Sequence, residues 1–488
     1  MQTSKQNVIK SLIKIISLLM LIVSSTFIIP IVVAIIYKEV GCVKAFLVPM
    51  AVTWVLSIFF LILFRKTKIS FSVRANFAIT ACCWIFSSLL GAFPLFLSGF
   101  FASFTDAFFE SVSGFTTTGA TIFKDVESLP RSINLWRCQM HWLGGMGIVA
   151  LTVALMPLIG VGGFQLIKAE TTGPEKGKIS PKITVTAKIL WFIYMGLTIL
   201  QTILLMVFGK MNFLDAISHS FSTLGTGGFS TKNTSVGYYN SSVIEWIIII
   251  FMFLAGINFN LFYYVFSKRI KEIFENTELK AYISIILISV LIIVIGNKDV
   301  KSNFVESLRF SFFHVISFIT TTGFSIDNYE NWTHVAQTIL FLLMFVGGMS
   351  GSTGGGVKVV RWVVLGKQMN NEVKKMLHPH GVFSIQLNGR PCRKEIVFNV
   401  SAFIFLYIIL LLLTTIVASF DGKDILTALS VSLTTVGNIG LGFAGIGPSG
   451  GFFDSSSFSK LWYSFSMLAG RLELYTILLI FMPEFWKK

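Results

Sequence analysis

Threonine and glycine gather in four short segments of this 488-residue chain, at intervals of roughly a hundred residues. Each segment lies between apolar stretches: Phe115–Gly119, Leu224–Gly228, Ile319–Gly323 and Leu433–Gly437. Irregular backbone at membrane depth is tolerated only where protein buries it or water reaches it. Backbone carbonyls can replace the hydration shell of a cation, and glycine adopts unusual backbone angles at little cost. The pattern predicts four loops that meet at one axis and bind potassium through Thr116, Thr117, Thr118, Gly119, Gly225, Thr226, Gly227, Gly228, Thr320, Thr321, Thr322, Gly323, Thr434, Thr435, Val436 and Gly437.

A further glycine-rich segment, Val346–Lys358, interrupts an apolar stretch. Its Gly, Ser and Thr residues would not sustain a lipid-facing helix. Its spacing also lacks the G-x-x-x-x-G-K-[ST] pattern of a phosphate-binding loop. We therefore predict a flexible intramembrane gate beneath the four loops, formed by Gly351, Ser352, Thr353, Gly354, Gly355, Gly356 and Lys358.

Arg471 stands in an otherwise apolar stretch near the end of the chain. A charge at membrane depth costs about 2.5–3.5 kcal/mol on insertion scales, so it must face protein or a water-filled cavity. The matching positions after the other loops carry Met146, Ile257 and Met349. An ion pair with Glu473 is the structural alternative, but residues two apart on a helix do not share a face. We predict that Arg471 is part of the gate, as an electrostatic barrier to cations.

Composition indicates the class of protein that must position these residues. The chain is 54% hydrophobic and 13% charged, and its mean hydropathy is +0.77, which is typical of a polytopic membrane protein. Its net charge of +16 does not indicate a nucleic-acid partner, because Lys and Arg cluster in loops at one set of helix ends. By the positive-inside rule these ends, and both termini, are cytoplasmic. We expect membrane lipid to surround the apolar spans.

The predicted fold is all-α, with ten spans and four pseudo-symmetric repeats around one pore. The expected spans are residues 12–37, 45–64, 77–97, 135–159, 186–208, 243–266, 281–295, 335–365, 396–419 and 460–481. Each repeat consists of a span, a short pore helix, a loop and a second span, and two extra spans precede the first repeat. Short helices are expected at Phe104–Gly114, Phe213–Thr223, Ser302–Phe318 and Asp424–Leu433, the third one turn longer than the others. Only the second span of the third repeat is expected to be conspicuously broken. The predicted divisions are an N-terminal two-span domain at 1–70 and repeats at 71–168, 169–272, 273–377 and 378–488.

Polar residues recur at matching positions before the loops. Asp106, Asp215 and Asp424 lie near the expected helix starts, where a carboxylate stabilises the positive end of the helix dipole. Glu110, His219 and His314 stand nine residues before a loop glycine. We interpret the first set as helix caps and the second as residues that pack behind the loops.

Over essentially its whole length the chain resembles TrkH-type potassium uptake subunits of the Trk/Ktr/HKT superfamily. The resemblance rests on the four loops, Ala169–Glu175 through Thr186–Trp191, the glycine-rich segment and Gly470-Arg-Leu-Glu473. It implies potassium as the transported ion, a bacterial inner membrane, a homodimer and cytosolic nucleotide-binding subunits of the TrkA type. In this superfamily a serine in place of the first filter glycine is associated with sodium transport, so Gly119 favours potassium. We expect no organic cofactor on this chain.

Two other classes of function fit the sequence less well. An alternating-access transporter would show paired halves with broken helices in corresponding positions, whereas this chain has a fourfold repeat. A membrane enzyme could use His141, Glu110 and Arg471, but no HExxH motif, paired acids or nucleophile elbow accompany them. The sequence therefore predicts a channel-like transporter and not an enzyme.

Overall fold

The computed structural model describes residues 5–67, 73–147, 183–297, 303–392, 394–448 and 450–483. Helices dominate these residues. Six stretches among them are long and apolar enough to cross a membrane. One combines α1 and α2, and the others are single helices. Their bounds are α1 Lys5–Ser25, α2 Ile28–Ile36, α3 Val40–Leu63, α4 Val73–Leu97, α9 Ile183–Val207, α14 Thr277–Gly296 and α18 Lys394–Phe420.

Three of the predicted continuous spans are broken, where the sequence analysis expected one conspicuous break. The predicted span at 243–266 consists of α11 and α12, which are bent by 96° relative to each other. The two at 335–365 and 460–481 are also split by non-helical backbone. The helices concerned are α11 Ser242–Ala255, α12 Phe259–Phe266, α16 His334–Leu343, α17 Val359–Leu377, α20 Ser457–Arg471 and α21 Tyr475–Phe481. The predicted span at 135–159 begins within α6, Arg131–Gly145, and continues into residues outside the description.

Four short helices stand where the sequence predicted them. They are α5 Phe104–Phe115, α10 Phe213–Gly225, α15 Phe304–Ile319 and α19 Ile425–Gly437. The third has 16 residues, against 12 in α5 and 13 in each of the other two, so the expected extra turn is present. Each begins at a side chain that accepts a hydrogen bond from a backbone N–H of the first turn: Ser103, Asn212, Asn303 and Asp424. Such caps satisfy N–H groups that the helix itself leaves free.

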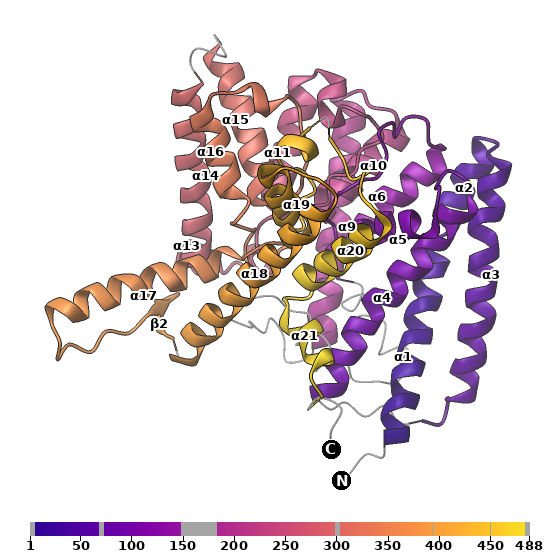
Figure 1. The fold of residues 1–488 in the computed structure, drawn as a ribbon, viewed down its shortest axis with the longest axis horizontal. Helices are drawn as coiled ribbons and strands as arrows, with labels where there is room; N and C mark the ends of the chain where they lie inside the picture. The colour runs from indigo at the N-terminus through magenta and orange to yellow at the C-terminus, as the bar shows by residue number, and fades with distance from the viewer. Residues whose placement is uncertain are drawn as a thin grey trace.

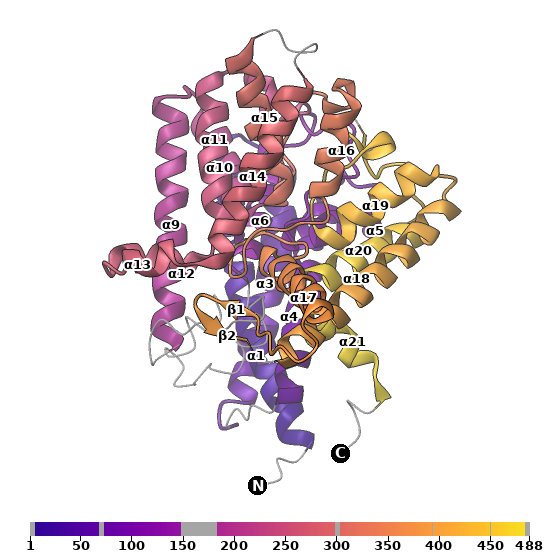
Figure 2. The ribbon, with the colours of Figure 1, turned by 90° about the vertical axis from the view of Figure 1, so that its left-hand side faces the viewer.

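Each short helix packs against the helix that precedes it and the helix that follows it (Figures 1 and 2). The groups are α4–α5–α6, α9–α10–α11, α14–α15–α16 and α18–α19–α20. Neighbouring groups also touch, because α10 packs on α6, α15 on α11 and α5 on α20. The contact between α5 and α20 joins the first group to the last.

The remaining elements are short: α13 Ile270–Phe274, the 3₁₀ helices η2 Ser235–Tyr239, η3 Tyr329–Asn331 and η4 Ala444–Ile446, and the strands β1 Gln386–Leu387 and β2 Arg390–Pro391. The strands pair antiparallel, with Gln386 opposite Pro391. Helix α17 projects away from the bundle, with this hairpin alongside (Figure 1).

Candidate functional site

The backbone after each short helix makes the same turn. The four turns are Thr116–Gly119, Gly225–Gly228, Thr320–Gly323 and Gly437–Gly440. The second residue of each is left-handed, with φ between 53° and 57°: Thr117, Thr226, Thr321 and Asn438. The fourth residue is a glycine with φ between 79° and 84°: Gly119, Gly228, Gly323 and Gly440. Such angles strain a residue that has a Cβ atom and favour glycine.

Backbone hydrogen bonds establish the same correspondence. The amide N–H of the third residue in each turn donates to the carbonyl five residues earlier. The pairs are Thr118 to Ser113 at 2.9 Å, Gly227 to Ser222 at 2.8 Å, Thr322 to Ser317 at 2.8 Å and Ile439 to Thr434 at 3.0 Å.

The four turns close a ring. A Cβ atom on the glycine of one turn would overlap the carbonyl oxygen of the third residue in the next turn. This holds for Gly119 against Gly227, Gly228 against Thr322, Gly323 against Ile439 and Gly440 against Thr118. Four backbone carbonyls, from residues 118, 227, 322 and 439, therefore lie in a closed cycle.

This geometry corrects the fourth predicted loop by three residues. Thr434, Thr435 and Val436 belong to α19, and Gly437 begins the turn. The hydroxyls of Thr434 and Thr435 donate to carbonyls one helical turn earlier, at 2.9 and 2.8 Å to Val431. By composition, Thr-Thr-Val-Gly matches the other three segments, whereas Asn438 to Gly440 do not. Asn438 is nevertheless a local signal for the turn, because asparagine is one of the few residues that adopt the left-handed conformation readily.

The three aspartates that the sequence predicted as helix caps do not occupy equivalent positions. Asp424 precedes its turn glycine by three residues more than Asp106 and Asp215 precede theirs. It is the cap of α19, whereas the other two lie in the first turns of α5 and α10. Asp106 forms an ion pair with Lys460 at 2.7 Å, which links α5 to α20.

The polar residues predicted to pack behind the loops contact the chain just after three of the turns. The hydroxyl of Thr121 donates to Glu110 at 3.0 Å. His219 Nε2 lies 2.9 Å from the hydroxyl of Ser230, and His314 Nε2 lies 3.4 Å from that of Ser325. Each of these hydroxyl residues follows a turn glycine by two positions, so the helix and the exit of its turn are joined.

Arg137 is a supporting residue that the sequence analysis missed. Its guanidinium forms an ion pair with Glu110 at 2.7 Å, and both side chains are buried. It lies on α6 within a stretch that the sequence analysis had interpreted only as a span. Its charge in an apolar stretch was the signal that could have identified it.

Two cavities flank the ring. The wider one, about 820 Å³, is lined by all four turn glycines and by Lys124, Lys232 and Asp327 among others. The narrower one, about 160 Å³, is lined by residues 351–356, Lys358 and Arg471. A Cβ at Gly354 would lie 2.8 Å from the Thr320 carbonyl oxygen, and one at Gly355 would lie 2.8 Å from that of Gly437. The glycine-rich segment, Val346–Lys358, therefore lies against the first residues of the turns, on the side away from their glycines.

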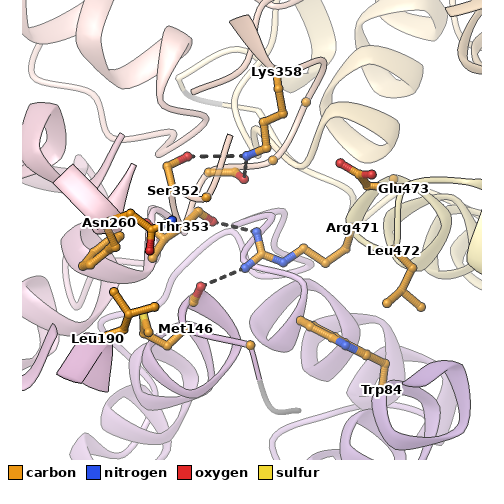
Figure 3. Close-up of a pocket in the computed structure, with 18 of the residues that line it drawn as sticks. Trp84, Met146, Leu190, Asn260, Ser352, Thr353, Lys358, Arg471, Leu472 and Glu473 are labelled. Atoms are coloured by element: carbon orange, nitrogen blue, oxygen red, sulfur yellow. Dashed lines mark hydrogen bonds between the residues drawn. The ribbon is translucent and has the colours of Figure 1, made fainter. Parts of the chain in front are cut away.

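Hydrogen bonds hold the glycine-rich segment against other parts of the chain. The N–H of Gly355 donates to the Thr321 hydroxyl at 2.7 Å. The hydroxyl of Thr353 donates to the carbonyl of Ala255 at 3.1 Å. Within the segment, the buried Lys358 ammonium donates to the Gly354 carbonyl, and it lies 3.4 Å from the Ser352 hydroxyl (Figure 3).

Arg471 joins the glycine-rich segment to α6 (Figure 3). One guanidinium nitrogen donates to the Thr353 carbonyl at 2.7 Å, and the other donates to the carbonyls of Gly144 at 2.8 Å and Gly145 at 3.2 Å. Glu473 forms an ion pair with Arg361 of α17 at 2.9 Å. The structure therefore brings Arg471 together with all the other predicted gate residues around the narrow cavity.

One stretch that carried the resemblance, Ala169–Glu175, and the basic residues around it lie outside the described residues.

Comparison with known proteins identifies the family. Residues 43–488 match the family model TrkH, described as a cation transport protein. The chain is 37% identical over 484 residues to the Trk system potassium uptake protein TrkH of Escherichia coli K12, covering 98% of this chain and 99% of that protein. It is also 37% identical to TrkH of Halomonas elongata, with coverage of 98% and 100%. The crystal structure of the potassium transporter TrkH from Vibrio parahaemolyticus superposes with a TM-score of 0.87 at 32% identity, covering 98% of this chain and all of that one. The chain belongs to the TrkH family and, like its relatives, is a membrane transporter and not an enzyme.

Proposed function

We propose that this chain takes up potassium across the cytoplasmic membrane of a bacterium through a pore lined by the four turns. The observation that carries the proposal is the closed cycle of backbone carbonyls at residues 118, 227, 322 and 439. A ring of carbonyl dipoles can replace the hydration shell of a potassium ion. The names of the relatives support the same ion. The filter consists of the turns as corrected above, with Gly437, Asn438, Ile439 and Gly440 as the fourth.

The glycine-rich segment and Arg471 form the gate in this proposal. The segment lies against the first residues of the turns, and Arg471 places a positive charge beside the narrow cavity. Regulation by cytosolic nucleotide-binding subunits of the TrkA type and assembly as a homodimer are proposed from the family resemblance. The proposed arrangement keeps both termini cytoplasmic and the repeats at 71–168, 169–272, 273–377 and 378–488.

Ion flux into liposomes tests the proposed function. The purified full-length chain is reconstituted, and uptake of potassium, rubidium, sodium and lithium is compared under the same gradient. We expect potassium and rubidium to enter faster than sodium and lithium. Equal rates for all four ions would contradict a carbonyl filter in these turns.

Gly119→Ser is expected to reduce the preference for potassium over sodium by about tenfold or more. Gly119 has φ of +84°, and an added Cβ would overlap the Gly227 carbonyl oxygen, so that oxygen must move. The measurement is relative permeability in liposomes. Gly99→Ser is the matched control, because Gly99 has φ of +79° but its Cβ would meet no atom within 4 Å. The same loss of preference in both variants would show that backbone strain, not the carbonyl, is responsible.

Deletion of residues 351–355 is expected to increase flux and to reduce its dependence on the cytosolic partner. The deletion removes Thr353 and Gly355, which bond to Arg471 and to the third turn. Initial uptake rates are compared with those of a chain lacking residues 379–383 in the exposed connection between α17 and β1. A deletion variant that assembles but conducts no faster than this control would mean that the segment is only a structural kink.

A further inference from the structure

An apolar groove lies between α1, α3 and α4, on helices that contribute little to the ring and its cavities. It measures about 610 Å³ and is lined by residues such as Ile16 of α1, Val52 and Phe60 of α3, and Phe86 and Phe93 of α4. Among the described residues that line it, only Ser17, Thr53 and Ser57 are polar. The three helices pack against one another, and lining side chains such as Val52 and Phe86 are exposed.

Basic side chains gather at one end of this groove. Lys10 and Lys14 lie on the first turns of α1, and Arg65 and Lys66 directly follow the last turn of α3. The ammonium of Lys14 donates to the carbonyl oxygens of Arg65 at 3.2 Å and Thr67 at 3.3 Å. This contact places the start of α1 beside the end of α3, so the four basic residues, called the basic cluster here, lie at one end of the groove.

No carboxylate on the three helices compensates this cluster. The segments Lys5–Ser25, Val40–Leu63 and Val73–Leu97 contain no Asp or Glu. Glu39, which precedes α3, lies at the opposite end of that helix and accepts backbone hydrogen bonds from Arg131 at 2.8 Å and Ser132 at 3.1 Å. An anion from outside the three helices is therefore the partner that fits the cluster.

We propose that this groove binds one anionic phospholipid. An acyl chain lies between α1, α3 and α4, and the lipid phosphate contacts Lys10, Lys14, Arg65 and Lys66. Basic pockets between membrane helices bind anionic headgroups through charge, and each Lys or Arg adds to the attraction. The apolar lining accepts the chain, since it offers almost no hydrogen-bonding group. The proposal assigns a ligand to the N-terminal helices, whose role the filter and the gate do not explain.

Lipid binding to the purified full-length chain tests whether the site prefers an anionic headgroup. Phosphatidylglycerol and phosphatidylcholine are titrated in detergent, and bound lipid is counted by native mass spectrometry. The test variant is Lys10→Gln/Arg65→Gln/Lys66→Gln, which keeps Lys14 and its link to α3. We expect the parent to prefer phosphatidylglycerol, and each neutralised charge to weaken that preference about fivefold. Lys38→Gln/Lys44→Gln, at the other end of these helices, is the control and should bind as the parent does.

A bulky side chain placed in the groove tests whether an acyl chain binds there. Thr53→Phe places a ring in the groove and leaves every charge in place, so we expect it to lose the bound phosphatidylglycerol. Val55→Phe adds the same bulk to α3 at a side chain that is 68% exposed and does not line the groove, and should bind as the parent does. Glycerophosphoglycerol, a headgroup without chains, should not compete. The proposal fails if the parent shows no headgroup preference, if Thr53→Phe binds as tightly as Val55→Phe, or if the headgroup alone competes.

Discussion

Gly440→Ser is expected to abolish most of the preference for potassium over sodium, whereas Gly437→Ser should retain it. Gly440 has φ of +80°, and its added Cβ would overlap the carbonyl oxygen of Thr118, one of the four in the ring. Gly437 ends α19, and the atoms nearest to its added Cβ would be side-chain atoms of Ile439 at 3.1 Å and Tyr407 at 3.4 Å. Side-chain atoms can move aside, whereas a carbonyl in a closed ring cannot move without changing the site. Relative permeability in liposomes measures both variants.

This comparison decides between the two alignments of the fourth segment. Gly422→Ser is the control for backbone strain in the same quarter of the chain, because Gly422 has φ of +75° and open space at its Cβ position. If Gly437→Ser loses the preference for potassium and Gly440→Ser keeps it, the fourth filter segment is Thr434–Gly437, as composition suggests. The turn Gly437–Gly440 would then not be part of the filter. We expect the loss for Gly440→Ser to reach about tenfold or more in permeability ratio.

Arg471→Ala is expected to increase cation flux while the preference for potassium over sodium is kept. The guanidinium lies beside the narrow cavity and donates to the carbonyls of Thr353, Gly144 and Gly145. Its removal takes away both a repelling charge and the link that holds the glycine-rich segment to α6. Two like charges a few ångströms apart repel by about 4 kcal/mol at an intermediate dielectric constant. Removing this repulsion should raise the cation flux by about tenfold. The filter turns are untouched, which is why selectivity should persist.

Two further variants separate charge from geometry. Arg471→Lys keeps the charge but loses the planar fork that contacts two segments at once, so its flux should lie between those of the parent and Arg471→Ala. Arg361→Ala removes a nearby guanidinium that pairs with Glu473 and donates to none of these three carbonyls. If Arg361→Ala raises flux as much as Arg471→Ala does, general loosening of the region explains the effect. If Arg471→Ala assembles and conducts no faster than the parent, Arg471 is structural.

Local spacing was sufficient to predict much of this protein. The short helices were predicted to within a few residues of their observed starts, and Asp424 was correctly interpreted as a cap. A cap acts within one turn of the chain, so local sequence is enough to predict it. Apolar length predicted the six long stretches that are found among the described residues. Glycine content predicted that Val346–Lys358 would not be a regular helix. Each of these features depends on residues that are neighbours in sequence, so no knowledge of the tertiary structure was needed.

The tertiary structure decided what depends on distant neighbours. The fourth turn begins at Gly437 because Ile439 and Gly440 must fit against Gly323 and Thr118, which are far away in the sequence; composition alone favoured the Thr-Thr-Val-Gly string. The break between α20 and α21, at residues 472–474, contains no glycine, although Glu473 and Leu474 both have positive φ. The carbonyls that receive Arg471 come from two segments more than a hundred residues away in the chain. The sequence shows which residues can adopt a turn conformation, carry a charge or bind an ion. Tertiary packing determines which distant residue each of them contacts.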